Sequence, residues 1–269
     1  MHKYASDLDV TFHLREPVIR AAIQAMQLPM GSHGLDAGCG IGLQAVMLAE
    51  AIGEDGHVTG LDLSPELLEC AIQNVAEAGL GERISFKEGN VNALPFDDNS
   101  FDWAWSMDCV GYLPLDPGPM LKELARVVKP DGRVAILAWS SEQLLPGYPQ
   151  LEARLKATTM GIAPFVKGMK PELHFLRALG WFRAAGLKES TSQTFAGDAY
   201  APLSDELRKG VEAILQMRWI GVEAELSAED RREYQRLCQP ESADYILDQP
   251  DYYAFFTYTM FTGLVAKAD

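Results

Sequence analysis

Residues 34–42 read GLDAGCGIG, and this segment restricts the possible fold more than any other part of the chain. A short apolar run leads into glycines at alternate positions, and a helical pattern follows over 43–52. Glycine permits a sharp turn and lets a ligand lie against bare backbone, while the N-terminus of the next helix attracts a negative group. The segment therefore predicts a strand, a tight turn and a helix that together form a ligand site.

The region from 34 to 140 alternates short apolar runs with longer amphipathic ones, which predicts an α/β fold with a parallel sheet. Ser64 is the expected N-cap of one helix, with Pro65 at its first position and Gly79 as its stop. Strands are expected at 34–37, 57–61, 84–87, 101–105 and 133–139, and helices at 43–52, 65–78 and 119–128.

The segments on either side of this region differ in pattern. Residues 1–30 read as a loop followed by an amphipathic helix over 17–26, which we expect beside the sheet or over the site as a lid. After residue 140, Ser204 and Ser227 are expected N-caps. The remaining helices are expected at 151–159, 171–185, 205–220 and 228–237, with strands at 188–195 and 252–267.

These patterns predict a single domain, 1–269. It comprises an N-terminal lid segment (1–30), a ligand-binding core (31–140), two helical cap insertions (141–186 and 199–250) and a terminal strand (251–269). The N-terminus has no apolar signal-peptide core, and no run approaches the ~20 apolar residues that span a bilayer. The four cysteines form no CxxC pair, which favours a reducing compartment, so we expect the cytoplasm.

The net charge of -15 disfavours a nucleic-acid partner, because affinity for a phosphate backbone comes from clustered lysine and arginine. A local basic patch formed by Arg15, Arg20, Lys167, Lys170 and Arg177 would weaken that argument. The chain has no HxH, HExxH or Cys/His grouping with metal-ligand spacing, so no metal is expected.

The spacing of the glycines bears on the ligand. The dinucleotide fingerprint is GxGxxG, whereas this chain has GxGxG with Leu43 at the place of the third glycine or alanine. Asp62 ends the second expected strand, where a carboxylate can accept both hydroxyls of a ribose. Two simpler interpretations are a turn without a ligand and Asp62 as a helix cap, although Ser64 already serves as the cap.

Four segments in order resemble the class I S-adenosylmethionine-dependent methyltransferases, in the group similar to the ubiquinone and menaquinone biosynthesis enzymes. They are LDAGCGIG at 35–42, GLDLSPELLECA at 60–71, EGNVNALPFDDNSFDWAWS at 88–106 and LKELARVVKPDGRVAI at 121–136. The resemblance implies a Rossmann-like fold with a mostly parallel seven-stranded sheet, an antiparallel last strand and helical cap insertions. It implies S-adenosylmethionine as cofactor and S-adenosylhomocysteine as product.

The resemblance also assigns the cofactor contacts. Gly38 and Gly40 would cradle the methionyl part, with Asp36 near its amino group. Asp62 would hold the ribose hydroxyls, and Leu63 would pack on the adenine.

The resemblance also bears on the adenine site and on the surroundings of the methyl group that the cofactor would donate. The family usually has aspartate where this chain has Asn90, whose carbonyl oxygen can accept the same adenine hydrogen, while the amide of Val91 serves a ring nitrogen. Ser106 and Met107 would lie near the transferring methyl group.

Catalytic candidates are fewer. Many relatives have a histidine shortly after the fourth strand, but residues 107–112 contain none. Asp108 or Tyr112 could assist deprotonation of an acceptor, and packing explains both equally well. His13 and His174 are the remaining candidates, although a lone histidine is usually structural or solvated. Methyl transfer from a sulfonium ion is an in-line displacement. It needs alignment of the reacting atoms and exclusion of water, and a dedicated base is not always necessary.

The expected substrate is a small organic molecule methylated on oxygen, nitrogen or carbon. Residues 214–220 and the aromatic residues of 252–258 could line an apolar pocket for an aromatic or lipid-like acceptor, or could simply be core. The alternatives are a methyltransferase acting on protein or RNA, a protein that binds the cofactor without catalysis, and a nicotinamide dehydrogenase. The sequence does not indicate the oligomeric state.

Overall fold

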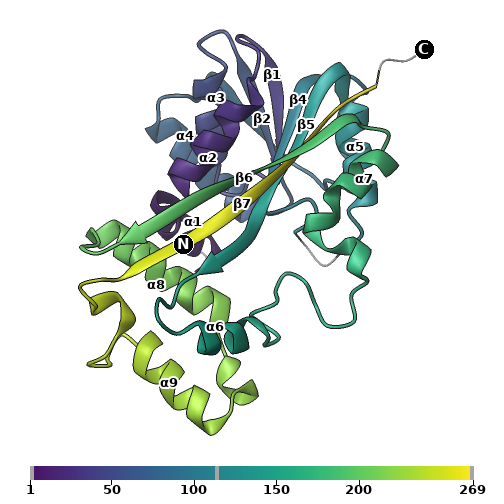
Figure 1. The fold of residues 1–269 in the computed structure, drawn as a ribbon. Helices are drawn as coiled ribbons and strands as arrows, with labels where there is room; N and C mark the ends of the chain where they lie inside the picture. The colour runs from purple at the N-terminus through teal and green to yellow at the C-terminus, as the bar shows by residue number, and fades with distance from the viewer. Residues whose placement is uncertain (1–2, 113–114, 267–269) are drawn as a thin grey trace.

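A seven-stranded sheet forms the centre of the part of the chain that the computed structural model describes, residues 3–112 and 115–266 (Figure 1). Its order is β3-β2-β1-β4-β5-β7-β6; β1 to β5 are parallel, and β7 is antiparallel to both β5 and β6. The strands are β1 (His33–Ala37), β2 (His57–Asp62), β3 (Ile84–Glu88), β4 (Phe101–Met107), β5 (Val128–Gln143), β6 (Lys188–Tyr200) and β7 (Tyr253–Leu264). Each expected strand is present, and the mixed sheet implied by the resemblance is confirmed.

Helices cover both faces of this sheet, which is why its parallel strands are apolar on both sides. One face packs against α2 (Phe12–Met26), α3 (Leu43–Ala51) and α4 (Pro65–Glu77), and the other against α5 (Gly118–Val127) and α7 (Ala178–Ala184) (Figure 1). Trp103 and Trp105 on β4 belong to the first core, and Ala104 between them belongs to the second.

The three expected serine caps are confirmed. The side-chain oxygens of Ser64, Ser204 and Ser227 accept hydrogen bonds from the amides of Leu67, Leu207 and Asp230, which satisfies free donors in the first turn. These serines begin α4, α8 (Asp205–Trp219) and α9 (Ala228–Cys238).

The N-terminus is more helical than the sequence pattern predicted. A helix, α1 (Lys3–Val10), occupies the segment expected to be a loop, and α2 begins at Phe12 with Pro17 inside it. The buried stripe Leu14, Val18 and Ala22 runs across the proline. Burial of that stripe outweighs the amide donor that proline lacks, so Pro17 does not mark the start of the helix.

The segment 171–185 also differs from the expected continuous helix. Two short 3₁₀ turns, Pro171–Leu173 and Phe175–Arg177, precede α7, and the side chain of His174 caps the second turn. Before them, α6 spans Pro149–Lys156. The terminal strand ends at Leu264, and residues 267–269 of the expected strand lie outside the described residues.

The helices α6, α8 and α9 gather at the end of the sheet where β5 finishes and β7 begins (Figure 1). In the described parts of the chain, no helix is both long and apolar enough to cross a bilayer.

Gly34 provides a test of the packing between β1 and β4. A Cβ atom at Gly34 would lie 2.0 Å from the buried Trp103 ring, whereas one at Gly180, in α7, would meet nothing within 4 Å. We expect Gly34→Ala to lower the free energy of unfolding by about 1–3 kcal/mol. Gly180→Ala should leave it unchanged or raise it by about 0.5–1 kcal/mol, because alanine favours the helix. Urea denaturation of both variants measures the difference, and equal stabilities would contradict this account of the β1–β4 contact.

Candidate functional site

The glycine turn after β1 is tied to the end of β2. The amides of Gly38 and Cys39 donate to the carbonyl oxygen of Leu61 at 2.7 and 3.0 Å, and the amide of Gly40 donates to Asp62 Oδ2 at 2.9 Å. Gly38 has a φ of +82°, and a Cβ atom there would lie 2.6 Å from Cys109. Backbone conformation and space together therefore require glycine at this position.

A cavity of about 190 Å³ lies over this turn, and we call it the glycine-turn cavity. Gly38, Gly40 and Asp62 form one wall. Tyr4, Leu8, Phe12 and Arg15, from the two N-terminal helices, form the opposite wall.

Asp36 lies on β1, just before the turn, and is 1% exposed. Its Oδ2 atom has no hydrogen-bond partner among the described residues. Burial, and then the negative charge of Asp62, raise the pKa of the Asp36 carboxyl to about 8. A nearby cation would relieve both effects.

The predicted ribose and adenine contacts follow β2 and β3. Asp62 accepts bonds from the amides of Gly40 and Ser64 and lines the cavity. Leu63 is 66% exposed. The amide of Gly89 donates to the carbonyl oxygen of Asp62 at 2.9 Å, which holds the two strand ends side by side.

Asn90 and Val91 come next along the chain. Asn90 is exposed, and its Oδ1 accepts from the amide and the side chain of Asn92 at 2.9 and 3.1 Å. Val91 is buried. Neither residue lines the glycine-turn cavity, and nor does Leu63. These three residues lie beyond the enclosed space, at the edge formed by the ends of β2 and β3.

Ser106 is fully buried at the end of β4. Its hydroxyl donates to the carbonyl oxygen of Ala37 at 2.8 Å and accepts from the amide of Val110 at 3.3 Å. Ser106 therefore joins β1, β4 and the following turn, while its neighbour Met107 lines the glycine-turn cavity.

Asp108 joins four elements. It adopts a φ of +48°, and its Oδ1 accepts from the amide of Trp139 on β5 at 3.1 Å. Its Oδ2 accepts from the Tyr258 hydroxyl on β7 at 3.0 Å and lies 3.7 Å from Nη1 of Arg15 on α2. Burial raises the pKa of Asp108, although Arg15 and the two hydrogen bonds oppose this.

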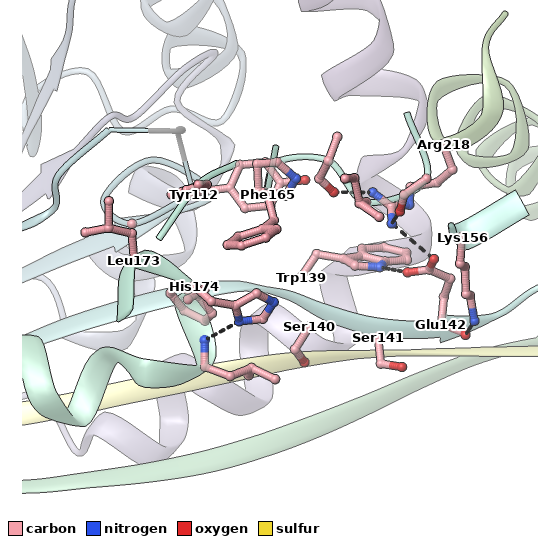
Figure 2. Close-up of a pocket in the computed structure, with 18 residues that line it drawn as sticks. Tyr112, Trp139, Ser140, Ser141, Glu142, Lys156, Phe165, Leu173, His174 and Arg218 are labelled. Atoms are coloured by element: carbon pink, nitrogen blue, oxygen red, sulfur yellow. Dashed lines mark hydrogen bonds and ion pairs between the residues drawn. The ribbon is translucent and has the colours of Figure 1, made fainter. Parts of the chain in front are cut away.

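A second cavity, of about 300 Å³, opens on the other side of the 107–112 segment, and Figure 2 shows its lining. We call it the aromatic cavity. Its walls come from the turn after β4, the end of β5, residues 161–176 and α8. Tyr112, Trp139, Phe165 and Phe175 contribute aromatic surface, and the indole of Trp139 stacks on Phe256 with ring centroids 4.8 Å apart.

A buried ion pair closes one end of the aromatic cavity. Glu142, 2% exposed, accepts from Trp139 Nε1 at 2.5 Å and from Arg218 Nη2 at 3.2 Å. Arg218 also donates to the carbonyl oxygens of Ala163 and Gly161 at 2.9 and 3.0 Å. The guanidinium therefore holds α8, β5 and the 161–163 loop together (Figure 2).

Residues that line the two cavities are joined by a hydrogen bond. Asp108 lines the glycine-turn cavity, and Trp139, whose amide it binds, lines the aromatic cavity. Tyr112 lines the aromatic cavity; burial raises the pKa of its phenol, and the negative charge of Asp108 adds to the effect.

The other predicted residues are placed as follows. His13 is exposed on α2 and lines neither cavity. Trp219, Tyr252, Phe256 and Tyr258, considered as pocket residues, are buried in the core. No group of three or more potential metal ligands occurs within residues 3–112 and 115–266.

The sequence analysis expected the N-terminal segment beside the sheet or over the site, but it missed the helix α1 within that segment and most of the aromatic cavity. Tyr4, Leu8 and Phe12 recur at intervals of four residues, a helical signal that was present in the segment assigned to a loop. Residues 161–170 form an irregular loop with no periodic pattern, so nothing local marked Phe165 as a cavity residue.

Comparisons with known proteins agree with this geometry. Residues 35–132 match the methyltransferase domain family. A demethylmenaquinone methyltransferase of Bacillus cereus is 32% identical over 188 residues, covering 70% of this chain and 73% of that protein. The enzyme of the same name from Listeria monocytogenes is 35% identical over 142 residues, and the match spans 53% of this chain and only 59% of the Listeria protein.

Among solved structures, the YcgJ protein of Bacillus subtilis has the same fold, with a TM-score of 0.60 and 21% identity over 94% of this chain and 100% of that one. The sheet order, the glycine turn and these similarities agree. The chain belongs to the class I S-adenosylmethionine-dependent methyltransferases, in the group of the menaquinone and ubiquinone biosynthesis methyltransferases.

Proposed function

We propose that this protein transfers a methyl group from S-adenosylmethionine to a small organic acceptor. The cofactor would occupy the glycine-turn cavity, and the acceptor would occupy the aromatic cavity. One observation carries the proposal. Asp108, which lines the glycine-turn cavity, accepts a hydrogen bond of 3.1 Å from the amide of Trp139, which lines the aromatic cavity. When bound, the sulfonium group of the cofactor supplies the methyl group.

The residues around the glycine turn fit this cofactor. Gly38 and Gly40 leave bare backbone for the methionyl part, and the buried Asp36 carboxyl, with its unpartnered Oδ2, suits an ammonium group. Asp62 accepts one hydrogen bond on each oxygen and keeps lone pairs for the ribose hydroxyls.

The adenine would lie at the open edge beside Leu63, Asn90 and Val91. Asn90 Oδ1 already accepts two hydrogen bonds from Asn92, so it would have to exchange one of them for the adenine amino hydrogen. We propose that the exposed surface of Leu63 packs on the ring.

The protein's part in the reaction would be alignment and exclusion of water. Asp108 is held from three directions and would fix the chain segment that lies beside the cofactor and the acceptor. Tyr112, with its raised pKa, stays a neutral phenol near pH 7 and would act as a hydrogen-bond donor rather than a base. Ser106 would act indirectly, by fixing the turn that carries these residues.

Enclosure supports a small-molecule acceptor over protein or RNA. The aromatic cavity is at the lower end of ligand-pocket volumes, and it is not an extended charged groove. Arg15 is buried against Asp108, and Arg20 pairs with Glu16 and Glu50, so the suggested basic patch loses two of its members. The names of the relatives, demethylmenaquinone methyltransferases, support an aromatic and lipid-like acceptor. The four unpaired cysteines support a reducing compartment, the cytoplasm.

Turnover tests the proposal directly. Purified protein would be incubated with S-adenosylmethionine and reduced demethylmenaquinone or smaller phenols, and formation of S-adenosylhomocysteine and methylated product would be followed by mass spectrometry. We expect product with at least one aromatic acceptor. Cofactor binding without turnover on any acceptor would favour a non-catalytic role.

Asp62→Ala tests the cofactor site. Loss of charge-assisted hydrogen bonds to two hydroxyls should weaken S-adenosylhomocysteine binding by about 1.5–3 kcal/mol, roughly ten- to a hundredfold. Calorimetry on the wild type, Asp62→Ala and the exposed control Asp97→Ala would measure this. NAD should bind to none of them. Wild-type affinity in Asp62→Ala, or binding of NAD in its place, would refute the assignment.

Asp36→Asn tests the ammonium contact through pH. The ionised carboxylate attracts an ammonium group, and the pKa of Asp36 in the free protein is about 8, so S-adenosylhomocysteine should bind more tightly as pH rises from 6 to 8. The gain is at most about tenfold per pH unit. Asp36→Asn should bind more weakly and lose this pH dependence. A parallel rise in the variant would show that another group titrates.

A further inference from the structure

His174 lines the aromatic cavity at the end away from the Glu142–Arg218 pair, with Trp139 between them (Figure 2). Its Nδ1 accepts a hydrogen bond from the amide of Leu176 at 3.2 Å. In a neutral imidazole, a nitrogen that accepts leaves the proton on the other nitrogen. His174 therefore carries its hydrogen on Nε2 and presents a donor.

The surroundings of His174 fix this donor in place. The ring packs against Phe165 with centroids 5.3 Å apart, and it caps the turn Phe175–Arg177. The sequence neighbours of His174 that line the cavity, Leu173, Phe175 and Leu176, are apolar. The His174 side chain is exposed, and the hydroxyl groups of Tyr112, Ser140 and Ser141 also line the cavity. An oriented donor beside apolar surface discriminates between ligands that can and cannot accept its hydrogen bond.

The opposite end of the cavity makes a poorer recognition site. The Glu142 carboxylate is almost completely buried and already holds Trp139 and Arg218. Arg218 donates three hydrogen bonds, to the Glu142 carboxylate and to the carbonyl oxygens of Ala163 and Gly161. The Glu142–Arg218 pair closes this end of the cavity. Trp139, which stacks on Phe256, provides a flat apolar surface between that pair and His174.

We propose that His174 is a specificity-determining residue that donates its Nε2 hydrogen to an oxygen of the acceptor. The inference rests on the proposed function in taking the aromatic cavity as the acceptor site. It adds that His174 recognises the acceptor and that an oxygen of the acceptor is the group recognised.

Two substitutions separate the roles of the two ring nitrogens. In His174→Asn, the amide oxygen can replace Nδ1 as the cap of Leu176, but the cavity donor is lost. In His174→Gln, the longer amide restores a donor near the position of Nε2 and sacrifices the cap. A purely structural role for His174 predicts that only His174→Gln has an effect.

The test uses two planar probes of nearly equal shape, acetophenone and α-methylstyrene, in which a methylene group replaces the carbonyl oxygen. Their dissociation constants would be measured by ligand-observed NMR with the full chain and S-adenosylhomocysteine present. We expect the ratio of the two constants to shift about three- to tenfold against the ketone in His174→Asn, the size of one neutral hydrogen bond. The ratio should be nearly unchanged in His174→Gln.

Leu173→Trp, which fills the cavity, should weaken both probes together and so locates their binding. The proposal is overturned if the ratio is unchanged in His174→Asn, if neither probe binds the wild type, or if binding persists in Leu173→Trp. Failure of turnover with every acceptor, while the ratio shifts as expected, would remove the proposed catalysis and leave the recognition by His174 standing.

Discussion

The half-buried carboxylate of Asp108 is the contact on which both cavities depend. It lies where β4 ends, in a left-handed backbone conformation, and it binds the amide of Trp139, the hydroxyl of Tyr258 and the guanidinium of Arg15. A charge that is largely withdrawn from water is stabilised by an ion pair and by hydrogen bonds, and these three partners supply both.

Arg15 extends this constraint to the N-terminus. Its side chain donates to the carbonyl oxygens of Leu8 and Thr11, at the end of α1 and the start of α2, and points its remaining charge at Asp108. The helix that carries Tyr4 and Leu8 over the glycine turn is thereby attached to the end of the sheet. The Arg15–Asp108 ion pair thus joins the N-terminal wall of the glycine-turn cavity to the segment that follows β4, and a change at Arg15 would disturb both.

The sequence predicted the sheet and the glycine turn after β1 well, because both depend on local signals. Alternating apolar runs define strands, Ser64 and Gly79 bound a helix, and Gly38 needs a backbone conformation and a space that only glycine provides. The N-terminal helices were missed because Pro17 was taken as a helix start, whereas burial of Leu14, Val18 and Ala22 carries the helix across it. Arg15 was assigned to a surface patch because nothing local reveals a partner at Asp108.

Most of the lining of the aromatic cavity was not predictable, for a physical reason. The aromatic cavity exists because Arg218 on α8 reaches Glu142, 76 positions earlier, and the loop carbonyls of Gly161 and Ala163. Those contacts order a loop that has no periodic pattern, and they leave the conspicuous aromatic residues Trp219 and Tyr252 in the core instead of the pocket. The glycine turn and the end of β2 are encoded within short motifs, whereas the aromatic cavity is assembled from distant segments. That difference explains why the family can be recognised from the sequence, while the lining of the aromatic cavity depends on tertiary contacts around Trp139 and His174.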